Sequence, residues 1–121
     1  MKSDNAKDVI RKVTRFTFDA ETFLVVGYNN GEGWVRSYDQ HPFAEVDASI
    51  VATYMMLQIT NLGLATTWVG HFDTTLLRSL CPDMQDYELI AIFPIGYAAD
   101  EAEPSPRHFV RKSREEILTT L

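Results

Sequence analysis

The sequence predicts one domain of the α+β or α/β class, in which helices pack in layers against a small sheet. Two apolar runs rich in β-branched and aromatic residues are typical of buried strands, Thr22–Tyr28 (TFLVVGY) and residues 87–97 (YELIAIFPIGY). Between them, an apolar segment with helical spacing predicts one long helix over residues 44–61. With 121 residues, the chain has the length of one domain that buries a core.

Composition and charge exclude several classes of function. The net charge is −6, which disfavours nonspecific binding to nucleic acid or to an anionic membrane. The N-terminal sequence MKSDNAKDVIRK lacks the apolar core of a signal peptide, and no apolar run is long enough to cross a bilayer. One cysteine, Cys81, cannot form an internal disulfide, so we expect a cytoplasmic protein. The basic residues Arg107, Arg111, Lys112 and Arg114 cluster near the C-terminus.

Local patterns predict the elements before the long helix. Apolar residues recur at helical spacing within residues 4–15, which predicts an amphipathic helix. The strand Thr22–Tyr28 comes next, followed by Asn29-Asn30-Gly31-Glu32-Gly33, a sequence typical of a turn because Asn and Gly tolerate positive φ. Residues 34–40 are expected to form an exposed loop or a short extended piece.

The long helix has apolar residues on most of its surface. One stripe follows the spacing of three or four residues, and its members are Phe43, Val46, Ile50, Tyr54, Leu57 and Asn61. Val51, Met55, Met56 and Ile59 widen the apolar surface beyond that stripe. Such a helix is either central in its fold or part of a subunit interface, so we expect a homodimer. Gly63 fits the left-handed residue that ends a helix.

The second half of the chain predicts short elements around the second strand. Residues 65–69 are expected to form a short strand, and Asp73 to cap a helix over residues 74–80. Pro94 indicates that the strand within residues 87–97 is irregular at its end or lies at an edge of the sheet. Residues 113–121 are expected to form a terminal helix with a capping box of Ser113 and Glu116.

Three blocks of the sequence together resemble the FMN-dependent nitroreductase family. The first comprises DASIVATYMMLQ, NLGLATTWV and HFD, and resembles the family's central helix and elbow. The second, residues 95–98 (IGYA), is similar to a strand that ends in Gly-Tyr-Pro, and the third is the tail PSPRHFVRKSREEIL. The resemblance covers roughly residues 20–121. It implies a nitroreductase-like fold with a homodimeric interface on the long helix, and one domain over residues 1–121.

The family resemblance implies a chemistry and a set of contact residues. FMN would accept hydride from NAD(P)H and pass electrons to a nitroaromatic or quinone, while the protein supplies position and electrostatics. The positions that match the family's flavin-facing backbone are Trp68, Val69, Gly70 and His71. Taken without the resemblance, the residues favour a structural interpretation, with Trp68 and Val69 as core residues and Gly70-His71 as a connector. No residue is assigned a catalytic proton transfer.

Arg111 matches the family's C-terminal arginine, which binds the FMN phosphate, and a planar guanidinium suits that group. A solvated basic tail is the alternative interpretation. The family also has an N-terminal Arg-Arg-Ser-type segment at the phosphate, and residues 1–16 do not match it. The domain is therefore expected to be an N-terminally shortened nitroreductase. Two functions follow: an FMN-dependent oxidoreductase, or a non-catalytic scaffold that has lost FMN binding.

No metal site is expected from the sequence. The histidines His41, His71 and His108 have no metal-ligand spacing with one another or with Cys81. The chain also lacks a phosphate-binding P-loop and the glycine fingerprint of a dinucleotide-binding turn. The sequence does not distinguish NADH from NADPH, and it does not identify the electron acceptor.

Overall fold

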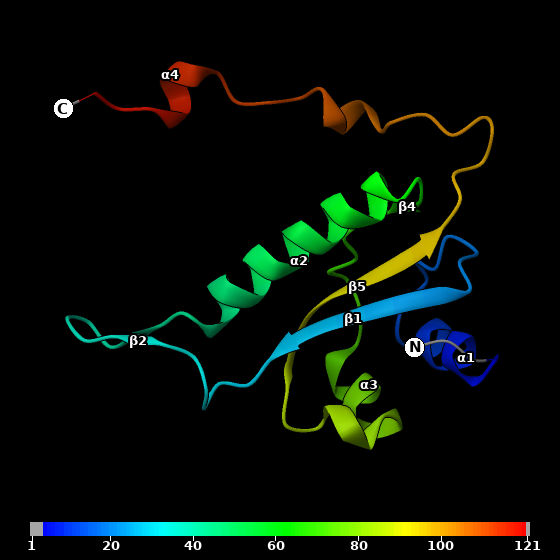
Figure 1. Cartoon of the computed structure of the whole chain (residues 1–121), viewed down its shortest axis with the longest axis horizontal. Coiled ribbons are helices and arrows are strands. Elements are labelled where there is room, and N and C mark those ends of the chain that lie inside the picture. The colour runs from blue at the N-terminus through cyan, green and yellow to red at the C-terminus, as the bar shows by residue number, and fades with distance from the viewer. Residues whose placement is uncertain (1–3, 121) are drawn as a thin grey trace.

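Three layers make up the fold, as seen in a computed structural model that describes residues 4–120. The helices are α1 (Asp4–Val13), α2 (Ala44–Asn61), α3 (Thr74–Leu80) and α4 (Arg114–Ile117), with 3₁₀ turns at Pro82–Met84 and Pro106–His108. The strands are β1 (Thr22–Tyr28), β2 (Val35–Arg36), β3 (His41–Pro42), β4 (Ala65–Thr66) and β5 (Glu88–Gly96). In Figure 1, α2 lies along one side of the β1–β5 sheet, and α1 and α3 lie on the other.

The main sheet is wholly antiparallel, which decides the fold class as α+β. Its strand order is β1-β5-β4, and β1 pairs with β5 from Thr22 opposite Ile95 to Tyr28 opposite Glu88. The register shifts between Val26 and Gly27, where a bulge interrupts the pairing. The predicted strands Thr22–Tyr28 and residues 87–97 are therefore confirmed, and they are direct neighbours.

Pro94 does not lie at an edge of the sheet, because β5 is the central strand. The N–H and C=O of Ile92 both pair with Val69, on the side of β5 that faces β4. Because successive strand residues alternate in direction, Pro94 faces the same side and has no N–H to donate. The expected strand over residues 65–69 accordingly stops at Thr66, whose hydroxyl donates to the Pro94 carbonyl at 2.8 Å. Pairing resumes only at the isolated bridge of Val69 with Ile92.

Each face of the sheet has its own hydrophobic core. On the face toward α1 and α3, Ile92 packs among Ile10 and Leu77, all fully buried. On the face toward α2, the neighbouring residue Phe93 packs with Ala52. The alternation of side chains along β5 therefore joins the two cores through one strand.

Helix α2 has the predicted bounds, but most of its large apolar residues are exposed; the exceptions are Ile59, which is buried, and Met56, which packs against the core. The buried residues of α2 include two alanines, Ala44 and Ala52, whose small side chains let the helix approach the strands closely. The opposite stripe of Val46, Ile50, Tyr54 and Leu57 is exposed. We call these four residues the outer stripe. Contiguous exposed apolar surface of this kind is often a site of protein–protein interaction.

The end of α2 matches the glycine prediction. Gly63 has φ +75°, which is the left-handed conformation that glycine adopts without strain. The N–H of Gly63 donates to Thr60 and the N–H of Leu64 donates to Ile59, at 3.0 and 3.2 Å. These two bonds form a Schellman motif, so the break after α2 is specified locally.

Asp73 caps α3 as predicted, and its carboxylate accepts the Leu76 N–H at 2.8 Å. We expect Asp73→Ala to lower the free energy of unfolding by about 1 kcal/mol, because it leaves that N–H without its partner. The bond from the Asp73 backbone N–H to Val13 does not depend on the side chain. Urea unfolding measures the change. Asp86→Ala, at an exposed position outside α3, is the control and should change stability by less than half as much.

The first and last helices are shorter than predicted. Helix α1 ends at Val13 rather than at residue 15, and α4 spans only Arg114–Ile117 of the expected 113–121. The Glu116 carboxylate accepts the Ser113 N–H at 2.8 Å, as the capping box requires. Every residue from 97 to 120 is exposed, and Figure 1 shows this tail running beyond α2, on the side away from the sheet. No helix within residues 4–120 is long and apolar enough to span a membrane.

Candidate functional site

The segment between β4 and α3 is anchored to the sheet at one residue. Val69 is buried and exchanges both backbone hydrogen bonds with Ile92, at 3.0 Å each. Its N–H is therefore already used and cannot also donate to a ligand. Of the four positions predicted to face a flavin, Val69 serves as the anchor.

The two residues after Val69 present free backbone donors. Within residues 4–120, the N–H groups of Gly70 and His71 have no hydrogen-bond acceptor, and both residues are exposed. The Thr14 hydroxyl donates to the His71 carbonyl at 2.8 Å, and the His71 ring meets Phe16 edge-on at 5.9 Å. These contacts fix the turn from one side, so its free N–H groups have a defined position. Thr14 was not predicted, because a partner 57 residues away leaves no local pattern.

Trp68 lies beside this turn and borders it with an aromatic ring. The side chain is 37% exposed and meets Phe93 edge-on, with ring centroids 5.4 Å apart. A Cβ atom on Gly70 would meet only the Trp68 indole, at 3.8 Å, which is ordinary contact. Packing within the chain does not require glycine there, although its lack of a side chain leaves the backbone open to a ligand. We call Trp68, Gly70 and His71 the amide wall.

A hollow of about 760 Å³ is lined by the chain segment that leads into the amide wall. Thr66 and Thr67, which directly precede Trp68, line it together with the end of β5. The loop before β1 closes another side, and Figure 1 shows that loop beside the tip of β5. The sequence did not predict this hollow, because its walls come from segments far apart along the chain.

Arg111 does not lie near the amide wall within a single chain. It belongs to the exposed tail, and its Nη1 donates to the carbonyls of Arg107 and Val110, both at 2.9 Å. In Figure 1, α2 lies between the tail and the sheet that anchors the amide wall. The structure therefore brings Trp68, Gly70 and His71 together and leaves Arg111 apart from them.

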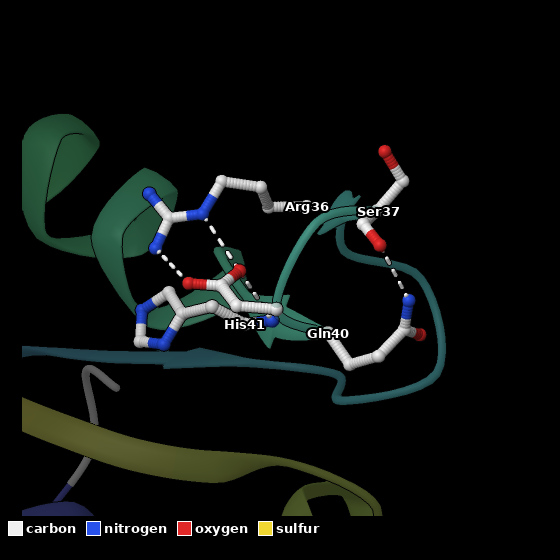
Figure 2. A network of polar contacts seen from close by, with 5 residues as sticks. Arg36, Ser37, Gln40 and His41 are labelled. Atoms are coloured by element: carbon white, nitrogen blue, oxygen red, sulfur yellow. Dashed lines mark hydrogen bonds and ion pairs between the residues drawn. The ribbon is translucent and has the colours of Figure 1, made fainter.

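A second polar cluster lies in the β2–β3 hairpin. The guanidinium of Arg36 donates to both carboxylate oxygens of Asp39, at 2.8 and 2.5 Å, and Gln40 donates to the Ser37 carbonyl (Figure 2). Arg36 also lies over the Phe43 ring, 5.3 Å from its centroid. The sequence predicted an exposed loop or a short extended piece over residues 34–40, and the short strand β2 agrees with the second alternative. The structure shows a hairpin that internal contacts hold in shape.

The Arg36 hydrogen bonds lower the pKa of Asp39 below its ordinary value of 3.8. A carboxyl whose pKa is lower in the folded state adds stability above the unfolded pKa, and this stability is lost as the pH falls through the folded pKa. We expect an NMR titration to place the Asp39 midpoint below 3.8. In Arg36→Gln the Asp39 midpoint should return toward 3.8. An unchanged midpoint would contradict the ion pair.

Metal ligands are not gathered in the described part of the chain. No group of three or more His, Cys, Asp or Glu residues within 4–120 is arranged to hold a metal ion. The donors available at the amide wall are backbone N–H groups, which bind oxygen or nitrogen acceptors of a ligand and not a cation.

The fold is an antiparallel α+β domain, with one apolar helix on one face of the sheet and two helices on the other. Free backbone amide donors lie beside the central strand, and this combination is what the comparison with known protein families has to match. A model of the nitroreductase family matches residues 6–97, which is most of the chain. The chain belongs to the nitroreductase family. The match begins before residue 20 and ends before the tail, so it differs from the expected range of 20–121 and does not include Arg111.

Solved structures show the same relationship. A nitroreductase family protein from Clostridium difficile 630 has a TM-score of 0.86 at 30% identity, and the match covers 100% of this chain and 72% of that one. A nitroreductase family protein from Clostridium novyi NT has a TM-score of 0.69 at 19% identity, over 82% of this chain and 59% of that one.

A third structure shares the fold alone. It is oxidized iodotyrosine deiodinase bound to FMN and 3-iodo-L-tyrosine, with a TM-score of 0.59 at 19% identity over 94% of this chain and 59% of that one. No curated protein matches the chain significantly.

Proposed function

We propose that the chain is an FMN-dependent NAD(P)H oxidoreductase that reduces nitroaromatics or quinones. The observation that carries the proposal is the pair of free N–H groups of Gly70 and His71, on a turn that Val69 and Thr14 hold in place. Backbone donors in a fixed position bind the polar edge of a flavin ring without a cost of reorganisation. FMN, when bound, supplies the hydride and electron transfer. Membership of the nitroreductase family, and the FMN bound to the deiodinase that shares the fold, support the choice of flavin.

Different residues of the chain would bind the two ends of FMN, the flavin ring and the phosphate. The amide wall would meet the ring, with Gly70 and His71 as donors and the Trp68 side chain beside them. Arg111 would meet the phosphate, because its Nε and Nη2 atoms have no described hydrogen bond within residues 4–120. These residues bind and orient the cofactor, and none of them is assigned a proton transfer.

The proposed functional unit is a homodimer in the cytoplasm. The outer stripe and the tail are both exposed in the single chain, and each contains large apolar residues such as Leu57 and Phe109. A second copy would bury them across a two-fold interface, where each side chain contributes twice. The single cysteine, Cys81, supports a reducing compartment.

Titration of the purified chain with FMN tests the proposal through quenching of flavin fluorescence. His71→Pro removes one N–H donor of the amide wall, whereas His71→Ala keeps it. We expect His71→Ala to bind FMN nearly as the parent chain does, and His71→Pro to bind about tenfold more weakly or worse. Unfolding curves of the two variants control for damage to the fold. Equal FMN affinities of the two stable variants would refute the role of the donor.

A scaffold without FMN is the second candidate function. The observation that favours it is Arg111, whose Nη1 is bonded to its own segment, away from the amide wall. The same titration separates the two candidates. A chain that forms a stable dimer and neither quenches FMN nor gains thermal stability from it would be a non-catalytic scaffold.

A further inference from the structure

The hollow has a one-sided charge. Its lining contains three carboxylates, those of Asp19, Glu21 and Glu103, and no lysine, arginine or histidine. Four of the basic residues instead lie together on the tail between residues 107 and 114. A ligand that enters the hollow therefore meets negatively charged side chains and no positively charged side chain of the lining.

Two of these carboxylates are not neutralised by a partner. Glu21 forms an ion pair with Lys7, whose hydrogen bond lowers the pKa of Glu21, so its charge is largely compensated. Asp19 and Glu103 have no ion pair within residues 4–120. Both are exposed, and they contribute about two formal negative charges at the hollow.

Two exposed aromatic residues line the hollow together with these carboxylates. Phe18 precedes Asp19 and is 65% exposed, and Tyr97 follows the end of β5 and is 87% exposed. Both rings line the hollow, whose remaining walls include Pro94 and Ile95. Aromatic faces beside carboxylates attract a flat cation, through the ring quadrupole and through the charge. The same lining repels an anion.

We propose that the hollow binds the electron acceptor and selects aromatic compounds that carry a positive charge. This inference rests on the proposed oxidoreductase function, and it names the substrate class of that site. The ring of the acceptor lies between Phe18 and Tyr97, and its cationic group faces Asp19 and Glu103. Thr66 and Thr67 line this position and directly precede Trp68 in the chain, which connects the hollow to the amide wall along the chain.

A binding experiment on the purified chain tests the inference without any turnover. Benzyltrimethylammonium, benzyl alcohol and benzoate share one ring and differ in charge. We expect the cation to shift the amide NMR signals of residues 18–21, 66–67 and 95–98 saturably, with the alcohol binding about threefold more weakly and benzoate tenfold or more. Benzoate that binds as tightly as the cation, or signals that shift only elsewhere, would overturn the inference.

Variants assign the preference to the two carboxylates. Asp19→Asn together with Glu103→Gln should reduce the preference for the cation over benzoate to about threefold or less, because it removes both uncompensated charges. Asp83→Asn and Glu115→Gln together remove the same amount of charge away from the hollow, and should leave the preference unchanged. A preference that survives the first pair, or that falls equally with the second, would refute the assignment.

Reduction assays separate this inference from the proposed function. For the chain loaded with FMN, we expect kcat/KM for 4-nitrobenzyltrimethylammonium to exceed that for 4-nitrobenzoate by about tenfold at low salt, and by less at high salt. A chain that binds the cation in the hollow but neither binds FMN nor reduces either compound would support the site and refute the oxidoreductase. A chain that reduces both compounds equally well would keep the oxidoreductase and refute the charge selection.

Discussion

Replacement of Tyr54 and Leu57 by glutamate is expected to convert the proposed homodimer into a folded monomer. These side chains are 70% and 62% exposed in the single chain, so neither contributes to the core beneath α2. Burial of each in an interface contributes about 1.5–3 kcal/mol, and a two-fold interface contains two copies of each. We expect the dissociation constant of the dimer to rise by at least about 100-fold.

Light scattering after size-exclusion chromatography measures this change, with circular dichroism as the test of folding. Gln58→Glu is the matched control, since it adds a negative charge to exposed α2 surface without removing an apolar side chain. We expect Gln58→Glu to remain a dimer. A parent chain that is monomeric at high concentration, or a Tyr54→Glu, Leu57→Glu chain that is still a dimer, would refute the interface.

The sequence predicted the bounds of α2 but not which side faces the sheet. Its turn-by-turn spacing identified the stripe of Val46, Ile50, Tyr54 and Leu57, and on hydrophobicity alone that stripe is the natural core face. The structure instead packs alanines such as Ala52 against β5, because small residues allow the helix and the strands to approach closely. The spacing of apolar residues identifies the apolar stripe of a helix, but not whether that stripe packs within the chain. Which face is buried within the chain depends on the size and shape of the strands opposite.

For the strands too, local sequence predicted where each strand lies, whereas the order of the strands in the sheet depends on residues far apart in the chain. Both long strands were predicted from their apolar runs, since that signal lies within each segment. Their order in the sheet was not. Of the two alternatives for Pro94, the position at a sheet edge was wrong, whereas the irregular strand end agrees with the interrupted pairing. A proline excludes only one hydrogen bond on one side of a strand. Here the partner on that side is interrupted at Thr67, and the sequence around Pro94 contains no information about that partner.

At the site, family resemblance located the segment and the structure assigned its parts. Residues 68–71 were predicted as one flavin-facing unit. The structure separates them into an anchor, Val69, and two donors, Gly70 and His71. The division depends on the bonds to Ile92 and Thr14, residues that are distant along the chain. The hollow was missed for the same reason, because its lining brings Asp19, Thr66 and Tyr97 together only after folding.

Arg111→Ala is expected to weaken FMN binding by about tenfold to a hundredfold. A hydrogen-bonded ion pair between a guanidinium and a phosphate contributes about 1.5–3 kcal/mol, and alanine removes both the charge and the planar donor pair. Only Nη1 of Arg111 is used within the described residues, so Nε and Nη2 remain available to a phosphate. Removal of one phosphate contact should also make FMN binding less sensitive to salt.

Fluorescence titrations with FMN and with riboflavin, which lacks the phosphate, separate a phosphate contact from a general effect on the tail. Arg111→Ala should weaken FMN binding and leave riboflavin binding unchanged. Arg111→Lys keeps the charge without the planar fork, so its FMN affinity should lie between those of the parent and the alanine variant. Arg114→Ala removes a neighbouring charge from α4 and serves as the control. If Arg111→Ala and Arg114→Ala weaken FMN binding equally, the tail attracts the phosphate only through its overall positive charge, and Arg111 has no specific contact.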